Sequence, residues 1–244
     1  MEHLTAVNLS DLKNRTFYYR AHARSDWDII RQIFEWSHYD LGNFALRENV
    51  EKFHAHLIEQ GKKPLIIDAG ANIGATLNWF AHAYAGSHIV AIEPAADNIQ
   101  VLRKNSDGID CTIYEGAIGS VNSTLTLQDI GYGEAGYRVV SSQDDQQNTT
   151  QVPVYSATEI VEHFTQQGMV PFIFKIDIEG SEAELFSQNL SWLSRFPLVI
   201  LELHDWMLPR TSNSRNFLRA ISALDDIDFV YRGENVFCFN YNLL

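Results

Sequence analysis

Cysteine is scarce in this chain, because 244 residues contain only two, Cys111 and Cys238. That is too few for the disulfide framework of a small secreted domain or for a four-cysteine zinc site. Both cysteines stand inside apolar, strand-like runs, so we expect them to be small core residues in a reducing compartment. The sequence therefore predicts a protein that folds without disulfide bonds or structural zinc.

Positive charge is scarce as well. Lys and Arg number 18 against 31 Asp and Glu, which gives a net charge of -13 at pH 7. No basic stripe that could match nucleic-acid phosphates is visible, and a negative chain is repelled by anionic membrane surfaces. We therefore expect no nucleic-acid and no membrane partner. A neutral or cationic small molecule, or a partner protein, fits this charge better, and the alternative that the acidity serves only solubility stays open.

Long apolar runs are also missing, and no run approaches the roughly 20 residues that a membrane helix needs. The opening residues Met-Glu-His-Leu-Thr-Ala-Val-Asn lack the basic and apolar regions of a signal peptide. The expectation is a cytoplasmic protein. The sequence makes no prediction about its oligomeric state.

From Pro64 onward, short apolar runs alternate with helical stretches. The expected strands cover residues 65–68, 88–93, 110–114, 172–177 and 198–203, and the expected helices cover 74–84, 96–106, 156–167, 182–190 and 214–224. Such alternation predicts an α/β fold with a mostly parallel central sheet and helices on both faces. Two further strand-like runs, Ile227–Arg232 and Val236–Tyr241, flank Gly233 and predict a C-terminal antiparallel hairpin.

Residues 1–61 are expected to form an N-terminal helical extension or cap, and residues 62–244 the main domain. Ser25-Asp26 can cap a first helix, and a second helix fits residues 50–58. The aromatic and charged run Phe17–Arg24 either caps the site or packs the extension onto the domain. Leu125–Leu127 and Tyr137–Val140 can form a small hairpin beside the polar stretch 129–150. That stretch is either a substrate-facing loop or a plain connection.

The stretch Asp68–Gly74 follows the buried run Leu65-Ile66-Ile67 and has the glycines of a tight turn into a helix. Glycine lets the backbone turn sharply and lets a ligand approach closely. A dinucleotide fingerprint requires Gly-x-Gly-x-x-Gly, but the three places here hold Gly70, Asn72 and Ala75. Asp68 would repel a pyrophosphate, whereas it suits the cationic ammonium of a methionine moiety, directly or through water. We therefore expect a cofactor-binding turn with these residues: Asp68, Gly70, Ala71, Asn72 and Gly74.

Glu93 is the second cofactor anchor, because it follows the apolar run Ile89–Ile92 at the tip of the next expected strand. A carboxylate at that place accepts the hydroxyls of a ribose. Pro94 would border an adenine, and Ala117 with Ile118 would hold the adenine ring from the end of the third strand.

Lys175, Asp177 and Glu179 alternate along the apolar run that begins at Phe172 and would share one face of a strand. Three charges on one face need partners or a cleft. Lys175 can pair with Asp177, Glu179 or Glu202, and a structural and a catalytic role for it both stay open.

Five segments in this order resemble the FkbM family of S-adenosylmethionine (SAM)-dependent methyltransferases: Asp-Ala-Gly-Ala-Asn-Ile-Gly, Ala-Ile-Glu-Pro, Gly-Ala-Ile-Gly, Lys-Ile-Asp-Ile-Glu-Gly-Ser-Glu and Val-Ile-Leu-Glu-Leu-His. The resemblance implies a Rossmann-like class I methyltransferase fold, with SAM as cofactor and S-adenosylhomocysteine (SAH) as product. It also implies O-methylation of a hydroxyl on a small molecule, sugar or glycan. Two alternatives stay open, an NAD(P)-dependent oxidoreductase and a non-catalytic binding protein with a SAM fold.

Three residues are the candidates for catalysis, namely Asp177, His204 and Lys175. The resemblance puts Asp177 at the reacting end, near the methionine part of the cofactor or the acceptor. An alcohol must lose its proton, and either His204 or Asp177 is the candidate base. Asp177, Glu202 and His204 could also hold a divalent cation that lowers the pKa of the acceptor hydroxyl, or could form only a paired polar network.

Overall fold

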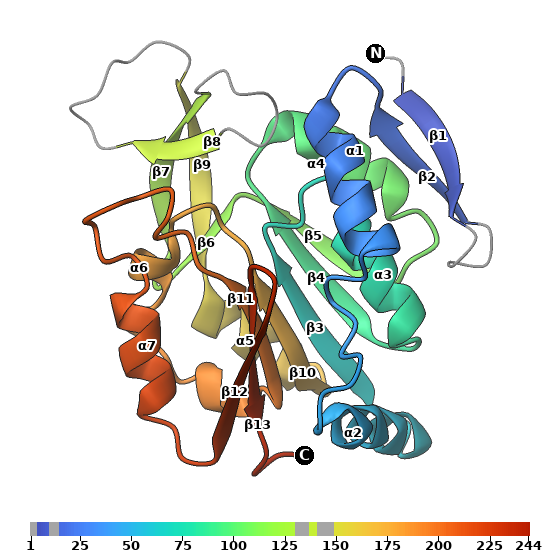
Figure 1. Ribbon diagram of the computed structural model, residues 1–244, viewed down its shortest axis with the longest axis vertical. Coiled ribbons are helices and arrows are strands. Elements are labelled where there is room, and N and C mark those ends of the chain that lie inside the picture. The colour runs from blue at the N-terminus through green and yellow to red at the C-terminus, as the bar shows by residue number, and fades with distance from the viewer. Residues whose placement is uncertain (1–3, 10–14, 130–136, 141–148) are drawn as a thin grey trace.

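The computed structural model describes residues 4–9, 15–129, 137–140 and 149–244. Its centre is a seven-stranded sheet in the order β12-β13-β11-β10-β3-β4-β5 (Figure 1). The strands are β3 (Lys63–Ala69), β4 (His88–Glu93), β5 (Cys111–Glu115), β10 (Met169–Ile176), β11 (Leu198–Glu202), β12 (Ile227–Arg232) and β13 (Asn235–Asn240). All neighbours from β5 to β11 pair in parallel, whereas β13 is antiparallel to β11 and β12. The expected mostly parallel sheet with a C-terminal antiparallel hairpin is confirmed.

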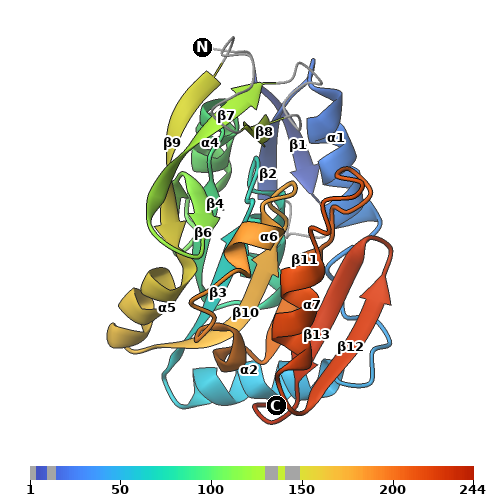
Figure 2. The same ribbon diagram turned by 90° about the vertical axis from the view of Figure 1, so that its left-hand side faces the viewer.

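The central strands are apolar on both faces, and each face has its own core. Along β3, Ile66 points into one core while Leu65 and Ile67 point into the other, as the two-residue period of a strand requires. The first core is closed by α2 (Arg47–Glu59), α3 (Ala75–Ala83) and α4 (Ala96–Asn105). The second is closed by α5 (Ala157–Gln166), α6 (Glu182–Leu185) and α7 (Arg215–Ser222), which face the viewer in Figure 2. Both faces of the sheet are therefore covered, as expected.

The strand order reverses at β3, because β4 lies on one side of it and β10 on the other. In open α/β sheets, ligands bind at the carboxyl ends of the strands beside such a reversal. The turn that follows β3 therefore opens into the crevice where a cofactor is expected.

A smaller sheet, in the order β6-β9-β7-β8, stands at the upper left of Figure 1. It contains β6 (Ala117–Gly119), β7 (Ser123–Asp129), β8 (Tyr137–Val140) and β9 (Thr149–Ser156). The expected hairpin between 125–127 and 137–140 is confirmed by the antiparallel pairing of β7 with β8, whereas β9 was not expected. Most of the polar stretch 129–150 lies outside the described residues, so its role stays a prediction.

Two expected helices differ from those observed. The helix expected over 182–190 ends at Leu185, and the chain then turns through Asn189, whose φ is 55°. At the N-terminal side, α1 (Arg24–Ile30) begins one residue before Ser25, and no side chain caps it. The expected Ser25-Asp26 cap is wrong because the Asp26 carboxylate instead binds Arg20, with its Oδ1 2.7 Å from Nη2 of the guanidinium.

The first 61 residues contain more than helices. β1 (Leu4–Leu9) and β2 (Arg15–Arg20) form an antiparallel pair that the sequence did not predict, and the π-helix η2 (Arg31–Glu35) continues α1. Phe17 is completely buried, and Tyr18 donates its amide to Asn105 Oδ1 on α4 at 2.8 Å. Of the two interpretations of Phe17–Arg24, these contacts favour packing of the extension onto the domain.

The N-terminal region also contacts the C-terminal hairpin. Arg232 on β12 donates to the carbonyl oxygens of Asp40 and Leu41, and its guanidinium lies 4.2 Å from the ring centre of Phe44. Phe44 in turn meets Phe237 of β13 edge to face, with ring centres 5.1 Å apart. The beginning and the end of the chain therefore share one core.

Within the described ranges, no helix has the length and apolar character to cross a membrane.

Candidate active site

The turn after β3 is tied by its backbone to both neighbouring strands. Gly70 and Ala71 donate their amides to the carbonyl oxygen of Ile92 on β4 at 2.9 and 3.0 Å. Gly70 has a φ of 78°, and a Cβ at this position would lie 1.7 Å from the carbonyl oxygen of Asp177. Only glycine fits there, because the turn touches the end of β10 without room for a side chain.

Asn72 and Gly74 complete the turn. Asn72 has a φ of 48°, and its Oδ1 accepts the amide of Ile73 at 2.8 Å, an arrangement that asparagine tolerates better than most residues. Gly74, with a φ of 87°, immediately precedes α3, and a Cβ there would lie 2.8 Å from Leu102 Cδ1. Gly74 therefore shapes the turn and packs against α4, while Asn72 faces the ligand side.

Glu93, at the tip of β4, is 5% exposed and held by three donors. Its Oε2 accepts the amide of Asn72 at 2.9 Å, and its Oε1 accepts from the amide of Ala95 at 3.0 Å and from Asn98 Nδ2 at 3.2 Å. Burial raises the pKa of this carboxyl, and the three donors oppose that rise. Oε2 has one protein donor, which leaves it a lone pair for a ligand hydroxyl.

Asn98 was not predicted as a site residue, although it links Glu93 to the N-terminal extension. Its Oδ1 accepts from Arg20 Nη2 at 2.8 Å while its Nδ2 donates to Glu93. Arg20 and Asp26 are both fully buried. The orientation of the cofactor-side carboxylate therefore depends on a buried ion pair in the extension.

A cavity opens between this turn, the tip of β4 and β6. Its walls are Gly70, Asn72, Ile92, Glu93, Pro94, Asn98, Gly116, Ala117, Ile118, Leu127, Asp177, Ile178, Glu179 and Ser181. Seven of the residues expected at the cofactor are among them: Gly70, Asn72, Glu93, Pro94, Ala117, Ile118 and Asp177. Ala71 instead lines an adjoining cleft, and Asp68 and Gly74 line neither space.

Asp68 is fully buried, and its Oδ1 lies 3.1 Å from the Nζ of Lys175. The pairing follows from the sheet, because Asp68 on β3 and Lys175 on β10 are register partners. The sequence had not suggested Asp68 as the partner of Lys175. Asp68 lines neither space, so of the two expected contacts with a cofactor ammonium, direct or through water, the direct one does not fit this position.

Lys175 is 1% exposed, and its ammonium also donates to the carbonyl oxygens of Ala69 at 3.2 Å and Gly70 at 2.7 Å. Burial alone would lower the pKa of this ammonium, but the carboxylate of Asp68 and the other neighbouring charges raise it well above its usual range. A permanently charged ammonium with its donors in use cannot act as a base. The geometry favours the structural alternative for Lys175, as a clamp on the cofactor-binding turn.

The adjoining cleft lies between the N-terminal extension, the end of β10 and the loop after β11. It is lined by Ser25, Asp28, Ile29, Gln32, Ile33, His38, Tyr39, Gly70, Ala71, Asn72, Ala75, Thr76, Lys175, Asp177, Glu179, Glu202, His204, Trp206, Met207, Glu234 and Asn235. Asp177 and Glu179 belong to the walls of both spaces. Gly70 and Asn72 line both spaces as well, so the two spaces meet along the turn after β3 and these two carboxylates.

His204 is 2% exposed and has carboxylates on both sides of its ring. Its Nδ1 lies 2.8 Å from Glu182 Oε1, and its Nε2 lies 3.5 Å from Glu202 Oε1 and 3.6 Å from Asp177 Oδ1. Burial would lower the pKa of the imidazole, but the surrounding carboxylates, Glu182 first, raise it to about 11. His204 is therefore an imidazolium at neutral pH, which disfavours it as the general base.

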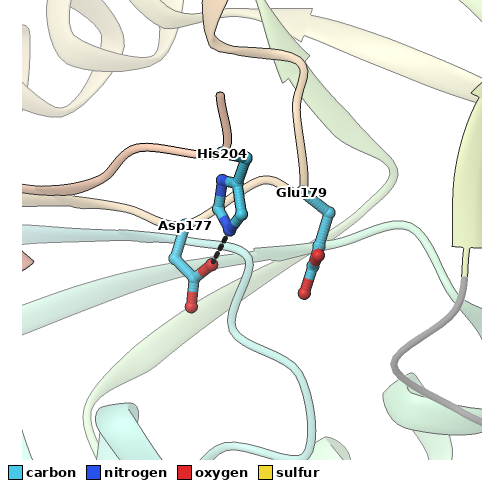
Figure 3. A group of neighbouring side chains, drawn as sticks. All are labelled: Asp177, Glu179 and His204. Atoms are coloured by element: carbon cyan, nitrogen blue, oxygen red, sulfur yellow. Dashed lines mark ion pairs between the residues drawn. The ribbon is translucent and has the colours of Figure 1, made fainter. Parts of the chain in front are cut away.

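The ring of His204 points at the carboxylate of Asp177, with Glu179 beside them (Figure 3), and one potential ligand atom from each of the three lies within 4.8 Å of the others. The sequence had suggested Glu202 as the third member instead of Glu179. β10 ends at Ile176, and Glu179 has a φ of 52°, so it does not continue the strand alternation that was expected. Glu179 keeps contact with solvent, but partial desolvation by the cleft walls, followed by the charge of Asp177, raises its pKa to about 7.

The fold and the cavity together define an α/β protein with a candidate cofactor cavity at the strand reversal. The Methyltransferase FkbM domain matches residues 68–231, which is more than half of the chain. The chain belongs to the FkbM methyltransferase family, as the resemblance had predicted. This assignment argues against the oxidoreductase alternative.

Similar solved structures were also found, whereas no curated protein matches the chain. An O-methyltransferase from Bacillus cereus in complex with SAH is 10% identical, with a TM-score of 0.44, and the match covers 87% of this chain and 89% of that one. The O-methyltransferase TomG from Streptomyces achromogenes, in complex with SAM, is 11% identical with a TM-score of 0.44 and 88% coverage of both chains. Both similarities are distant, and the family assignment rests on the domain match.

Proposed function

We propose that this protein transfers the methyl group of SAM to a hydroxyl oxygen of a small molecule, sugar or glycan. The observation that carries the proposal is the meeting of two spaces at Asp177 and Glu179. One space has the fixed carboxylate of Glu93 in its wall, and the other opens toward the N-terminal extension. A cofactor in the first would present its methyl group to an acceptor in the second.

The cofactor would lie with its ribose at Glu93, whose Oε2 has acceptor capacity left toward the cavity. Pro94, Ala117 and Ile118 would border the adenine ring. The methionine part would pass over Gly70 toward Asp177. The carboxylate of Asp177 lies on the cavity wall, whereas that of Asp68 does not. The TomG and Bacillus cereus enzymes are described with SAM and SAH bound, which agrees with this choice of cofactor.

The reaction would be an in-line displacement. The acceptor oxygen forms a bond to the methyl carbon while the carbon–sulfur bond breaks, and that electron pair stays on the sulfur of SAH. The hydroxyl proton passes to a carboxylate of the cleft, because His204 is already protonated. The donor is activated before it binds, so the protein contributes mainly alignment of the two partners.

The acceptor cleft is acidic, which bears on the kind of molecule that it accepts. Asp28, Glu179, Glu202 and Glu234 line it, and the indole of Trp206, 69% exposed, stands at its edge. Carboxylates repel phosphorylated or carboxylated acceptors and accept hydroxyl hydrogens, and an exposed indole offers an apolar face to a sugar ring. A neutral or amine-bearing polyhydroxylated acceptor fits best.

The free thiols of Cys111 and Cys238 agree with a reducing, cytoplasmic location.

Calorimetry with SAH and with NAD tests the cofactor. We expect SAH to bind and Glu93→Gln to weaken it on the order of 100-fold, since hydrogen bonds to a charged group contribute about 1.5–3 kcal/mol each. Glu115→Gln is the matched control, because Glu115 also ends a strand but lies outside the cavity. Tight NAD binding without SAH binding would overturn the proposal.

Methyl transfer from labelled SAM to a panel of neutral, cationic and anionic hydroxylated compounds tests the reaction. We expect labelled methyl ethers from the neutral or cationic members. Cofactor binding without any transfer across a broad panel would favour the non-catalytic alternative.

A further inference from the structure

Three side chains capable of binding a metal converge where the two spaces meet. Asp177 and Glu179 come from the loop after β10, and His204 comes from the loop after β11. Their potential ligand atoms all lie within 4.8 Å of one another (Figure 3). A metal bound by donors at about 2.1 Å has its neighbouring donors about 3.0 Å apart and its opposite donors about 4.2 Å apart. Small side-chain rotations would bring the three donors to these separations.

The histidine is held in the orientation that a metal ligand requires. Glu182 is fully buried, and it accepts the Nδ1 proton of His204 at 2.8 Å and the side-chain amide of Asn213. A buried carboxylate on one ring nitrogen fixes the tautomer and directs the other nitrogen at the metal in many sites. The Nε2 of His204 does point into the cluster, and its nearest carboxylates, at 3.5 and 3.6 Å, are farther than a normal hydrogen bond.

The cluster also carries an excess of negative charge. Its carboxylates are those of Asp177, Glu179, Glu182 and Glu202. The nearby ammonium of Lys175 lies closer to Asp68, at 3.1 Å, than to Asp177, at 3.7 Å. Carboxylates crowded in this way repel one another, and a dication among them would offset that repulsion.

We propose that Asp177, Glu179 and His204 bind one divalent transition-metal ion such as Mn²⁺. An imidazole together with two carboxylates suits such ions better than Mg²⁺ or Ca²⁺, which prefer oxygen ligands alone. The three protein ligands leave coordination positions open, and these face the acceptor cleft. The ion replaces the proton on Nε2 of His204 when it binds.

The role of the ion rests on the proposed methyl transfer. Bound to the acceptor's hydroxyl oxygen, it would lower the pKa of that hydroxyl. The proton then passes to Glu202, the carboxylate outside the ligand set, while oxygen attacks the methyl carbon and the carbon–sulfur bond electrons remain on SAH. The acceptor class narrows to compounds whose reacting hydroxyl, alone or with a neighbouring oxygen, can ligate a metal.

Titration of the metal-free protein with Mn²⁺, followed by the electron paramagnetic resonance signal of the free ion, tests the site directly. We expect one saturable site per chain, both with and without saturating SAH. Glu179→Gln should weaken binding about tenfold or more, and Glu182→Gln, which removes the carboxylate that orients His204 but no metal ligand, should do so too. Glu234→Gln is the control, because this substitution removes the same charge from an exposed side chain of the same cleft. It should leave the affinity for Mn²⁺ unchanged.

The outcomes separate the alternatives. Absence of one-to-one binding, or equal affinity of the wild type and Glu179→Gln, would overturn the metal site. Glu179 is exposed, so this variant should fold even if substitutions at His204 do not. Mutual exclusion of Mn²⁺ and SAH would also overturn it, since the carboxylates would then hold the cofactor ammonium. The last outcome is that the protein binds Mn²⁺, with the expected loss of affinity in Glu179→Gln and Glu182→Gln, but does not bind SAH. That result would support the metal site and refute the proposed function.

Discussion

Replacing Lys175 with methionine should destabilise the protein strongly, because the substitution leaves the buried carboxyl of Asp68 without its cation. Lys175 and Asp68 have side-chain exposures of 2% and 0%, and their charged atoms lie 3.1 Å apart. Breaking one partner of such a buried pair costs about 3–5 kcal/mol. In a chain of this size each kcal/mol shifts the melting temperature by about 2–4 °C, so we expect a decrease of about 6–20 °C.

The same substitution should weaken SAH binding, because the ammonium of Lys175 donates to the carbonyl oxygens of Ala69 and Gly70. These two carbonyls belong to the turn on which the cofactor is expected to rest. A purely global loss of stability would leave the affinity of the remaining folded protein unchanged. Calorimetry well below the melting temperature therefore separates local from global effects.

A double-mutant cycle measures the pairing itself. Asp68→Asn in the Lys175→Met background removes the uncompensated charge, and we expect it to recover at least about 2 kcal/mol of the loss, within the range measured for residues in contact. Lys63→Met is the matched control, since the Lys63–Asp110 ion pair is 47% and 51% exposed and should contribute no more than about 1 kcal/mol. The free energy of unfolding is measured by urea denaturation. If the losses caused by Lys175→Met and Asp68→Asn simply add in the double variant, the reasoning is refuted.

Three further substitutions test other parts of the site. Gly70→Ala places a Cβ 1.7 Å from the carbonyl oxygen of Asp177 and should abolish SAH binding in calorimetry, whereas Gly108→Ala, also at positive φ but with open space around it, should not; equal effects would contradict the steric argument. His204 has a pKa of about 11 when folded against 6.5 unfolded, so its stabilising contribution is complete below pH 6.5 and is lost as pH rises toward 11. In metal-free buffer, the difference in unfolding free energy between wild type and His204→Gln should shrink over that interval, and a pH-independent difference would refute the ion pairing. Trp206→Ala, at a side chain 69% exposed, should raise the KM for the acceptor about 2- to 10-fold, as expected for aromatic contacts of 0.5–1.5 kcal/mol, and should leave SAH affinity unchanged; unaltered kinetics would remove Trp206 from the acceptor site.

The elements that the sequence predicts well are those whose pattern is local. The apolar runs of β3 and β4, and the glycines at positions 70 and 74, depend only on neighbouring residues. They were enough to predict the parallel sheet and the cofactor-binding turn. The hairpin of β1 and β2 lacked a comparable signal, because its exposed, partly buried and buried side chains follow one another without a regular two-residue period.

The site residues that were missed depend on contacts between distant segments. The partner of Lys175 is fixed by the register of β10 against β3, which no short motif contains. The position of Glu179 depends on the end of β10 at Ile176 and on a backbone turn at positive φ. Asn98 joins the site because it donates to Glu93 while Arg20, from the distant extension, donates to it. Sequence patterns identify the chemical groups of such a site, but the fold decides which of them meet.

The contact of Arg232 with the carbonyl oxygens of Asp40 and Leu41 has a consequence for how the chain folds during synthesis. The segment that contains Phe44 must wait until β12 and β13 have been synthesised before its contact with Phe237 can form. Contacts of such long sequence separation slow folding and leave apolar surface exposed in the meantime. A nascent chain that stops short of β12 should therefore be a client for chaperones, even though its cofactor-binding turn is already complete.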